Sequence, residues 1–203
     1  MSLLAAAALG VGLGVFTGLP LGVINMAIVE AALAARPRVA LGLGLGGAIA
    51  DMLQAALAFV GVGQLVIARP EITRGFAILA GALIVGYAVL VWRRRRRPAA
   101  VQQDGSVWRS LGIGVSLTLP NPGALAAWVA VAAAVWPRAT PPEAVALALG
   151  VGAGSSVWFS VLGRLVAKLP REHRALKIFP RVAMAVLIGS GALGLVRLWL
   201  GWR

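Results

Sequence analysis

The chain has 203 residues, of which 60% are hydrophobic and only 12% are charged, and its mean hydropathy is +0.91. Soluble domains carry roughly 25% charged residues, so this composition excludes an ordinary soluble enzyme, a disordered protein and a soluble nucleic-acid-binding domain. Cysteine is absent and there is a single histidine, which excludes disulfides, thiolate chemistry and metal sites built from cysteine or several histidines. We therefore expect an integral membrane protein with no metal and no cofactor.

Six apolar stretches lie between the charged residues, and each is long enough for a transmembrane helix of roughly 20 residues. We expect them to form a single, entirely α-helical transmembrane domain over residues 1–203. The stretches cover residues 3–35, 39–67, 73–92, 108–136, 143–163 and 178–200.

Most of the 19 Lys and Arg residues fall in the links after the first, third and fifth stretches. The positive-inside rule places these links in the cytoplasm and both termini outside it. The net charge of +13 then belongs to cytoplasmic loops and does not indicate a nucleic-acid partner. The longest basic run is predicted to contact anionic lipids. It consists of Arg93, Arg94, Arg95, Arg96 and Arg97.

The first stretch contains a proline, Pro20, close to its middle. Proline removes a backbone donor and clashes with the preceding turn, so we expect the helix to be interrupted there. Gly22 and Asn25 follow the break, and together with Pro20 they are candidates for binding substrate. Glycines recur every four residues along this stretch, which in a membrane indicates close packing between helices.

The second stretch carries an acid, Asp51, as its thirteenth residue. At 1.5 Å per residue it lies roughly 18 Å into the membrane, near the midplane. No Lys or Arg lies at a comparable depth, and a carboxylate there is costly unless it is protonated or meets a cation. We interpret Asp51 as a residue that binds substrate and couples transport to protons; the alternative is a structural acid. Glu30 either neutralises Arg36 at the interface or belongs to the pathway.

The fourth stretch is interrupted by Pro120 and Pro122, which flank Asn121. Both predicted breaks lie in the first helix of a three-helix half, and because three is odd the second half is inverted in the membrane. The predicted fold is therefore two inverted repeats, about residues 1–92 and 108–203, joined by a basic cytoplasmic link over about 93–107. Paired broken helices in such a repeat indicate the central site of a transporter.

The predicted site combines groups that suit both ends of a zwitterion. Helix amides after a break carry partial positive charge and suit a carboxylate, whereas Asp51 suits an ammonium group. Asn25 and Asn121 each offer both donors and acceptors. We therefore count Asn121 and Pro122, at the second break, among the substrate-binding residues.

Four segments resemble elements of the lysine exporter (LysE/RhtB) family of amino-acid exporters. They are the P-x-G-x-x-N element Pro20 to Asn25, Ala48 to Asp51, Leu119 to Pro122, and Ser156 to Phe159. The resemblance implies a homo-oligomeric secondary transporter, not an enzyme, that exports amino acids across the bacterial inner membrane and uses the proton gradient. Exporters of basic amino acids tend to carry an acid after the Asn-Pro element; here Gly123 to Trp128 has none, which favours a neutral or other small substrate.

Two other classes of function are compatible with parts of the sequence. An exporter of a small cation would have the same architecture. A membrane scaffold or assembly protein would use the same glycine packing, but it would not need Asp51. An intramembrane enzyme is excluded, because His173 lies in a charged loop and no second acid matches the depth of Asp51.

Overall fold

The computed structural model describes residues 2–18, 22–61, 68–72, 105–136 and 139–168, together with separate positions between 75 and 89. Within these residues the regular structure is entirely helical, which confirms an all-α fold. The sixth predicted stretch, most of the third, and the run from Arg93 to Arg97 lie outside the described residues. The described helices are α1 (Leu3–Gly18), α2 (Val23–Leu33), α3 (Pro37–Phe59), α6 (Val107–Thr118), α7 (Pro122–Val135) and α8 (Pro141–Ala167).

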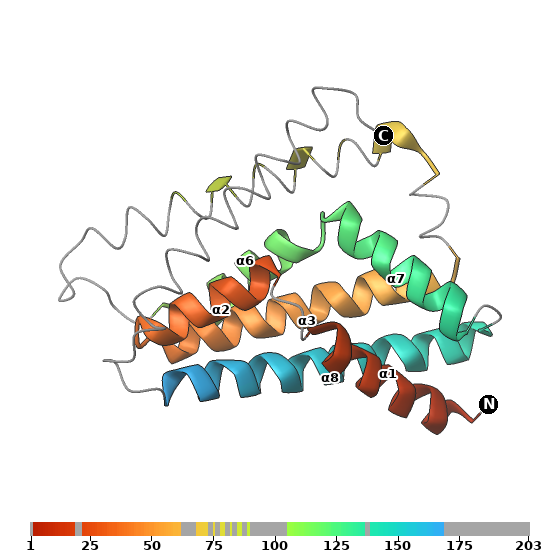
Figure 1. Ribbon diagram of the computed structural model, residues 1–203, viewed down its shortest axis with the longest axis horizontal. Helices are drawn as coiled ribbons and strands as arrows, with labels where there is room; N and C mark the ends of the chain where they lie inside the picture. The colour runs from red at the N-terminus through yellow and green to blue at the C-terminus, as the bar shows by residue number, and fades with distance from the viewer. Residues whose placement is uncertain are drawn as a thin grey trace.

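The two long helices, α3 and α8, lie side by side at the centre of the described fold (Figure 1). Each is long and apolar enough to cross a membrane alone. The pairs α1–α2 and α6–α7 meet the same criterion when each bent pair is taken as one span. The chain is therefore a multi-pass membrane protein, and the described part supplies up to four of its spans.

The second predicted break lies within the described residues, and the helices on either side of the first are described as well. α1 ends at Gly18 and α2 begins at Val23, while Pro20 itself lies outside the described residues. α6 ends at Thr118 and α7 begins at Pro122. The helices of each pair are bent by 72° relative to one another. The two pairs run in opposite directions along the molecule (Figure 1).

Two apolar clusters pack the described helices together, one on each side of the two helix breaks. One joins α1, α3, α7 and α8 and includes Phe59, Trp128 and Leu147. The other joins α2, α3, α6 and α8 and includes Ile28 and Phe159. The polar side chains in the middle of α3 therefore lie between two apolar layers.

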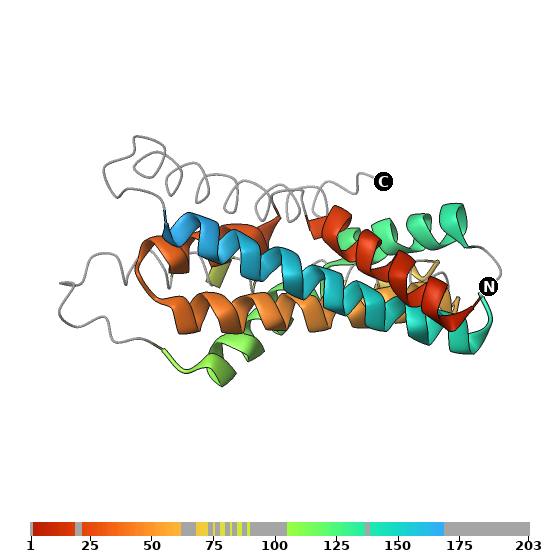
Figure 2. The same cartoon turned by 90° about the horizontal axis from the view of Figure 1, so that it is seen from below.

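Glycines bring the backbones of α1 and α8 into direct contact along the crossing seen in Figure 2. A Cβ atom added at Gly10 would strike the carbonyl oxygen of Leu147 and come within 3.0 Å of the Cα of Gly150. A Cβ at Gly154 would strike the carbonyl oxygen of Val11. This is the close packing that the four-residue glycine spacing predicted.

A second pair of helices, α3 and α6, packs in the same way. A Cβ added at Gly46 would strike the carbonyl oxygen of Leu111, and one added at Gly114 would strike that of Leu43. The first part of each broken helix is thus held by glycine contacts to a long helix: α1 to α8, and α6 to α3. Each long helix belongs to the other half of the chain.

The start of α8 is closed by an acid in its first turn. Glu143 is only 8% exposed, and its carboxylate accepts hydrogen bonds of 2.8 Å from both the backbone nitrogen and the hydroxyl of Thr140. The two residues form a capping box that satisfies backbone donors at the helix start.

A pair of alanine substitutions on α1 tests the glycine contacts. Gly10→Ala should destabilise the protein by about 1–3 kcal/mol, because the methyl group has no room against α8. Gly12→Ala is the matched control, since nothing lies within 4 Å of its added Cβ and the gain in helix propensity is the same. Thermal unfolding in detergent measures both variants; equal melting temperatures would contradict the described packing.

Candidate functional site

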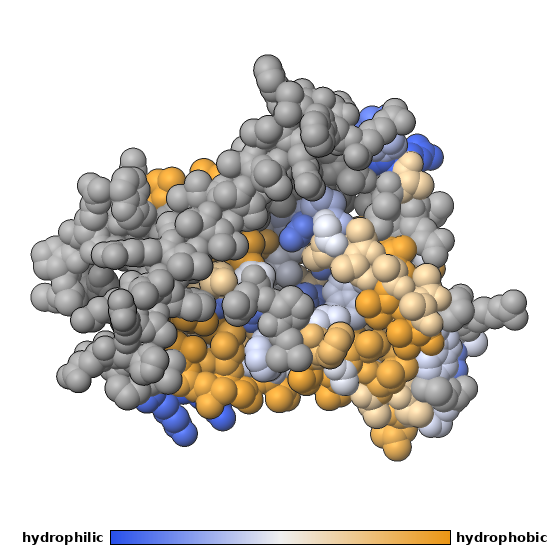
Figure 3. Space-filling model, viewed as in Figure 1, coloured by the Kyte–Doolittle hydropathy of each residue, from blue (hydrophilic) through white to orange (hydrophobic). Residues whose placement is uncertain are grey.

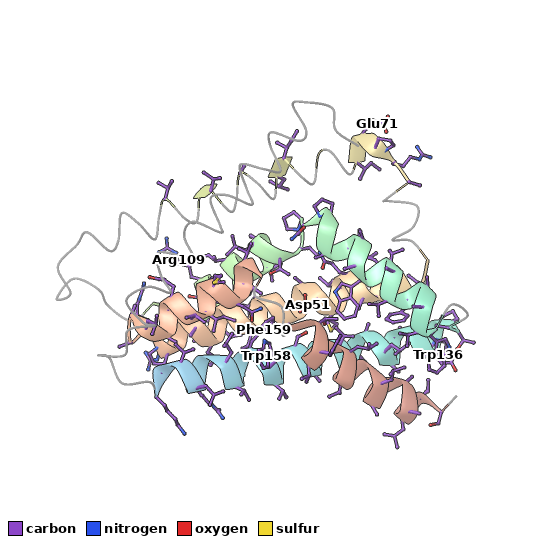
Figure 4. The ribbon with its side chains drawn as sticks, viewed as in Figure 1. Asp51, Glu71, Arg109, Trp136, Trp158 and Phe159 are labelled. Carbon is purple, nitrogen blue, oxygen red and sulfur yellow. The ribbon has the colours of Figure 1, made fainter. Side chains whose placement is uncertain are left out.

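Asp51 lies on α3 near the middle of the described fold (Figure 4). Its Oδ2 accepts a hydrogen bond of 2.9 Å from the hydroxyl of Ser155 on α8. Ser155 is completely buried, and its oxygen also lies 3.4 Å from the carbonyl oxygen of Gly14 on α1. The Ser155 hydroxyl therefore lies between the acid and the backbone of the first broken helix, one turn before that helix ends at Gly18, and its one proton has the shorter contact with Asp51.

The first break is closed by a chain of hydrogen bonds through Asn25. Its Nδ2 donates to the carbonyl oxygen of Gly18, at 2.9 Å, and satisfies a group at the end of α1. Its Oδ1 accepts from the indole nitrogen of Trp158, at 3.2 Å. Gly18 faces the ring of Trp158 so closely that an added Cβ would lie 2.5 Å from it. Asn25, which is 2% exposed, thus has both ends of its amide occupied.

The second break is contacted by a residue that sequence reasoning did not select, Gln54. Its Nε2 lies 3.1 Å from the carbonyl oxygen of Thr118, 3.0 Å from that of Leu119 and 3.4 Å from that of Asn121. These are carbonyls that lose their helical partners where α6 ends. Gln54 is 1% exposed and lies one turn after Asp51 on α3.

The amides at the start of α7 are satisfied by its own first residues. Asn121 is the N-cap, and its Oδ1 accepts from the nitrogens of Gly123 (3.0 Å) and Ala124 (3.4 Å). Pro122 has no N–H, and the nitrogen of Leu125 bonds to the carbonyl of Asn121. The sequence prediction that amides after this break are left for a substrate is therefore wrong for α7.

The start of α2 is different. Its N-cap is Gly22, which has no side chain, and no side-chain cap is formed there. α2 packs against α3 at this point, since a Cβ added at Gly47, one turn before Asp51, would lie 2.7 Å from the side chain of Ile24. The positive end of the α2 dipole is thus held beside the α3 turn that precedes the acid.

The structure brings together Asn25, Asp51 and Asn121 around α3, with Gly22 and Pro122 at the starts of the helices that follow the breaks. It adds Gln54, Ser155 and Trp158. The position of Gln54, a polar residue one turn from Asp51 in an apolar helix, was a signal available in the sequence. Trp158 lies in the segment Ser156 to Phe159, and its role becomes visible only through its bond to Asn25.

The described basic residues are arranged around this site rather than within it. Hydrophilic residues gather in the middle of one face, with apolar surface on either side (Figure 3). The described basic residues of the α2–α3 link, the start of α6 and the end of α8 lie at helix ends; they are Arg36, Arg38, Arg109, Arg164 and Lys168. Among the described residues no group of three or more His, Cys, Asp or Glu side chains is placed to hold a metal ion.

Comparison with known proteins identifies the family to which the chain belongs. Searches of curated proteins and of solved structures returned no match. The family model of the LysE type translocator matches residues 15–197, which include both breaks, Asp51 and Gln54. The chain therefore belongs to the LysE type translocator family, a family of membrane transporters.

Proposed function

We propose that this protein is a secondary transporter that exports amino acids, or similar small zwitterionic metabolites, across the bacterial inner membrane in exchange for protons. The observation that carries the proposal is the position of Asp51: an ionisable group in the middle of a transmembrane helix, between two broken helices. An acid at this depth is a functional candidate by default. Membership of a translocator family supplies the class of activity.

The packing of the described helices supports an inverted repeat. α1 contacts α8 through glycines, and α6 contacts α3 through glycines, so each broken helix packs on the long helix of the other half. Exchanging the two halves reproduces this pattern of contacts. We propose that the whole chain forms six transmembrane helices as two inverted three-helix repeats, over about residues 1–92 and 108–203, with the substrate between them.

In the proposed cycle Asp51 is occupied by one of two cations. A substrate ammonium binds the carboxylate from the cytoplasmic side, and a proton entering from outside takes its place after the substrate leaves. The hydroxyl of Ser155, 2.9 Å from Oδ2, stabilises the charged carboxylate in the interval between the two cations. Because the carboxylate holds one cation at a time, inward proton movement is coupled to outward substrate movement.

The described neighbourhood of Asp51 favours a substrate with one positive charge. The run from Gly123 to Trp128 has no acid. Lysine or arginine would bring a second cation, and α7 offers no carboxylate to receive it. We therefore propose neutral amino acids as the preferred substrates.

Replacing the acid tests this function directly. Asp51→Asn keeps the size of the side chain but cannot ionise, so proton-driven accumulation of amino acids in inside-out vesicles should fall to the level of vesicles without the protein. Its melting temperature should be unchanged or higher, because a buried ionisable group is removed. Glu71→Gln makes the same chemical change at an exposed acid remote from the site (Figure 4) and should transport normally.

The substrate is first identified in cells that express the protein and are fed a mixture of dipeptides, by measuring every amino acid released. Wild-type export rates in Asp51→Asn would make Asp51 a structural acid and would favour the scaffold interpretation. If the wild-type protein releases no amino acid, the proposed substrate class is wrong.

The orientation in the membrane gives an independent prediction. Arg36, Arg38, Arg109, Arg164 and Lys168 lie at helix ends that the chain direction places on one side. The positive-inside rule makes that side cytoplasmic and puts both termini outside. Reporter fusions after Arg203 should be active only as periplasmic reporters, and fusions in the Arg93–Arg97 run only as cytoplasmic ones; the reverse pattern would invalidate the proposed direction of transport.

A further inference from the structure

The amide of Gln54 has a fixed orientation in the second break. Its Nε2 lies within hydrogen-bond distance of three backbone carbonyl oxygens, at 3.0, 3.1 and 3.4 Å. Carbonyl oxygens only accept hydrogen bonds, so the nitrogen of the amide must face them and the oxygen must face away. The contacts with Thr118, Leu119 and Asn121 thus determine where Oε1 is placed.

This oxygen has no donor in the described part of the chain. Oε1 of Gln54 is buried and accepts no hydrogen bond there, and the residue as a whole is 1% exposed. Buried acceptors are nearly always paired, and one that lacks a protein donor marks a place where a ligand or a water supplies it. The Asn25 amide at the first break differs from the Gln54 amide, because protein groups contact both its nitrogen and its oxygen.

The polar groups that Gln54 contacts, and the acid one turn before it on α3, are acceptors. Asp51 precedes Gln54 by three residues on α3, a spacing that puts two side chains on the same side of a helix. The carbonyls of Thr118 and Leu119 lie at the end of α6, where the helix dipole is negative. A carboxylate, an amide oxygen and a helix C-terminus together suit a cation that carries several N–H donors.

The start of α2 suits an anion instead of a cation. Gly22 provides no side-chain cap, and the positive end of the helix lies beside Gly47 of α3. The start of α7 is not available to an anion in the same way, because Asn121 already accepts hydrogen bonds from its first amides. Gly47 and Gln54 are seven residues apart, or roughly 10 Å along the helix. An α-amino acid with a hydrogen bond at each end is about this long.

We propose that the two breaks bind opposite ends of the substrate, with Gln54 as a substrate-binding residue whose Oε1 accepts a hydrogen bond from the ammonium group held by Asp51. The carboxylate of the substrate then faces the start of α2. This inference rests on the proposed function of amino-acid export and adds to it a residue and an orientation. Compounds with a free amino group are recognised at the α6 end, and compounds with a free carboxylate at the α2 end.

The test is competition for transport in inside-out vesicles. The labelled probe is the amino acid that the wild-type protein exports fastest in the dipeptide assay. The competitors are the same amino acid unlabelled, its carboxamide, which keeps only the ammonium, and its N-acetyl form, which keeps only the carboxylate. Each half-inhibitory concentration is measured for the wild type, for Gln54→Met and for Leu53→Met. Leu53 is 40% exposed on the same helix and is the matched control.

In Gln54→Met the half-inhibitory concentrations of the amino acid and its carboxamide should rise about tenfold or more, the effect of losing a hydrogen bond to a charged group. The value for the N-acetyl form should not change, and Leu53→Met should match the wild type for all three. An equal change for all three competitors, or no change for any, would overturn the proposal. Failure of the proposed function looks different, since then the wild-type protein transports no amino acid.

A second variant covers the case in which Gln54→Met does not fold, as judged by its melting temperature. Gln54→Glu keeps the length of the side chain, and in its protonated form it offers an O–H donor to the carbonyls that Nε2 contacts and an acceptor oxygen in the place of Oε1. It should therefore favour the carboxamide over the N-acetyl form at least as strongly as the wild type does. A weaker preference would overturn the proposal. Replacing sodium with choline in the buffers should leave every value unchanged; a requirement for sodium would show that these oxygens hold a metal ion instead of an ammonium group.

Discussion

A helix that breaks inside a membrane leaves backbone groups that lipid cannot satisfy, and the described structure is arranged around this constraint. The carbonyl at the end of α1 is satisfied by Asn25, and the carbonyls at the end of α6 by Gln54. The amides that open α7 are satisfied by Asn121. Asn25, Gln54 and Asn121 thus each satisfy a backbone group at a break.

Close packing of helices makes these contacts possible. Ser155 has a short side chain, and its oxygen lies near both Asp51 of α3 and Gly14 of α1 because the glycines let α8 approach the backbone of α1. The contact of α3 with α6 at Gly46 and Gly114 similarly holds the end of α6 within the length of a glutamine side chain. The glycine stripes therefore serve the site as well as stability, because they set distances that side chains could not otherwise span.

The sequence allowed the breaks and the central acid to be predicted, since proline in an apolar run and an acid without a nearby base are local signals. The partners of Asp51 were not predictable in this way. Ser155 lies 104 residues away, and a serine in an apolar helix does not reveal which neighbour it faces. Gln54 was within reach of sequence reasoning, but its contact with Thr118 depends on how α3 and α6 cross.

The prediction of free amides at the Asn-Pro element was wrong for a reason that the local sequence contains. Asparagine followed by proline is a common start of a helix, with asparagine as N-cap and proline at the first position. Asn121 and Pro122 adopt this arrangement, so their local chemistry predicts a closed helix start. The expectation that both breaks offer free amides treated the two as equivalent, whereas the residue at the cap position differs: Asn121 before α7 and Gly22 before α2.

The two breaks differ in whether their hydrogen bonds stay within one half of the chain. The bond from Asn25 to Gly18 lies within the first half, so it would persist if the proposed halves moved as units. The bonds from Gln54 to Thr118 and Leu119 join the halves, so relative movement that separates α3 from the end of α6 breaks them. The released carbonyls then need another donor, because the lipid provides none. In the proposed cycle a substrate ammonium or water would be that donor, which would tie the energetic cost of such a movement to what occupies the site beside Asp51.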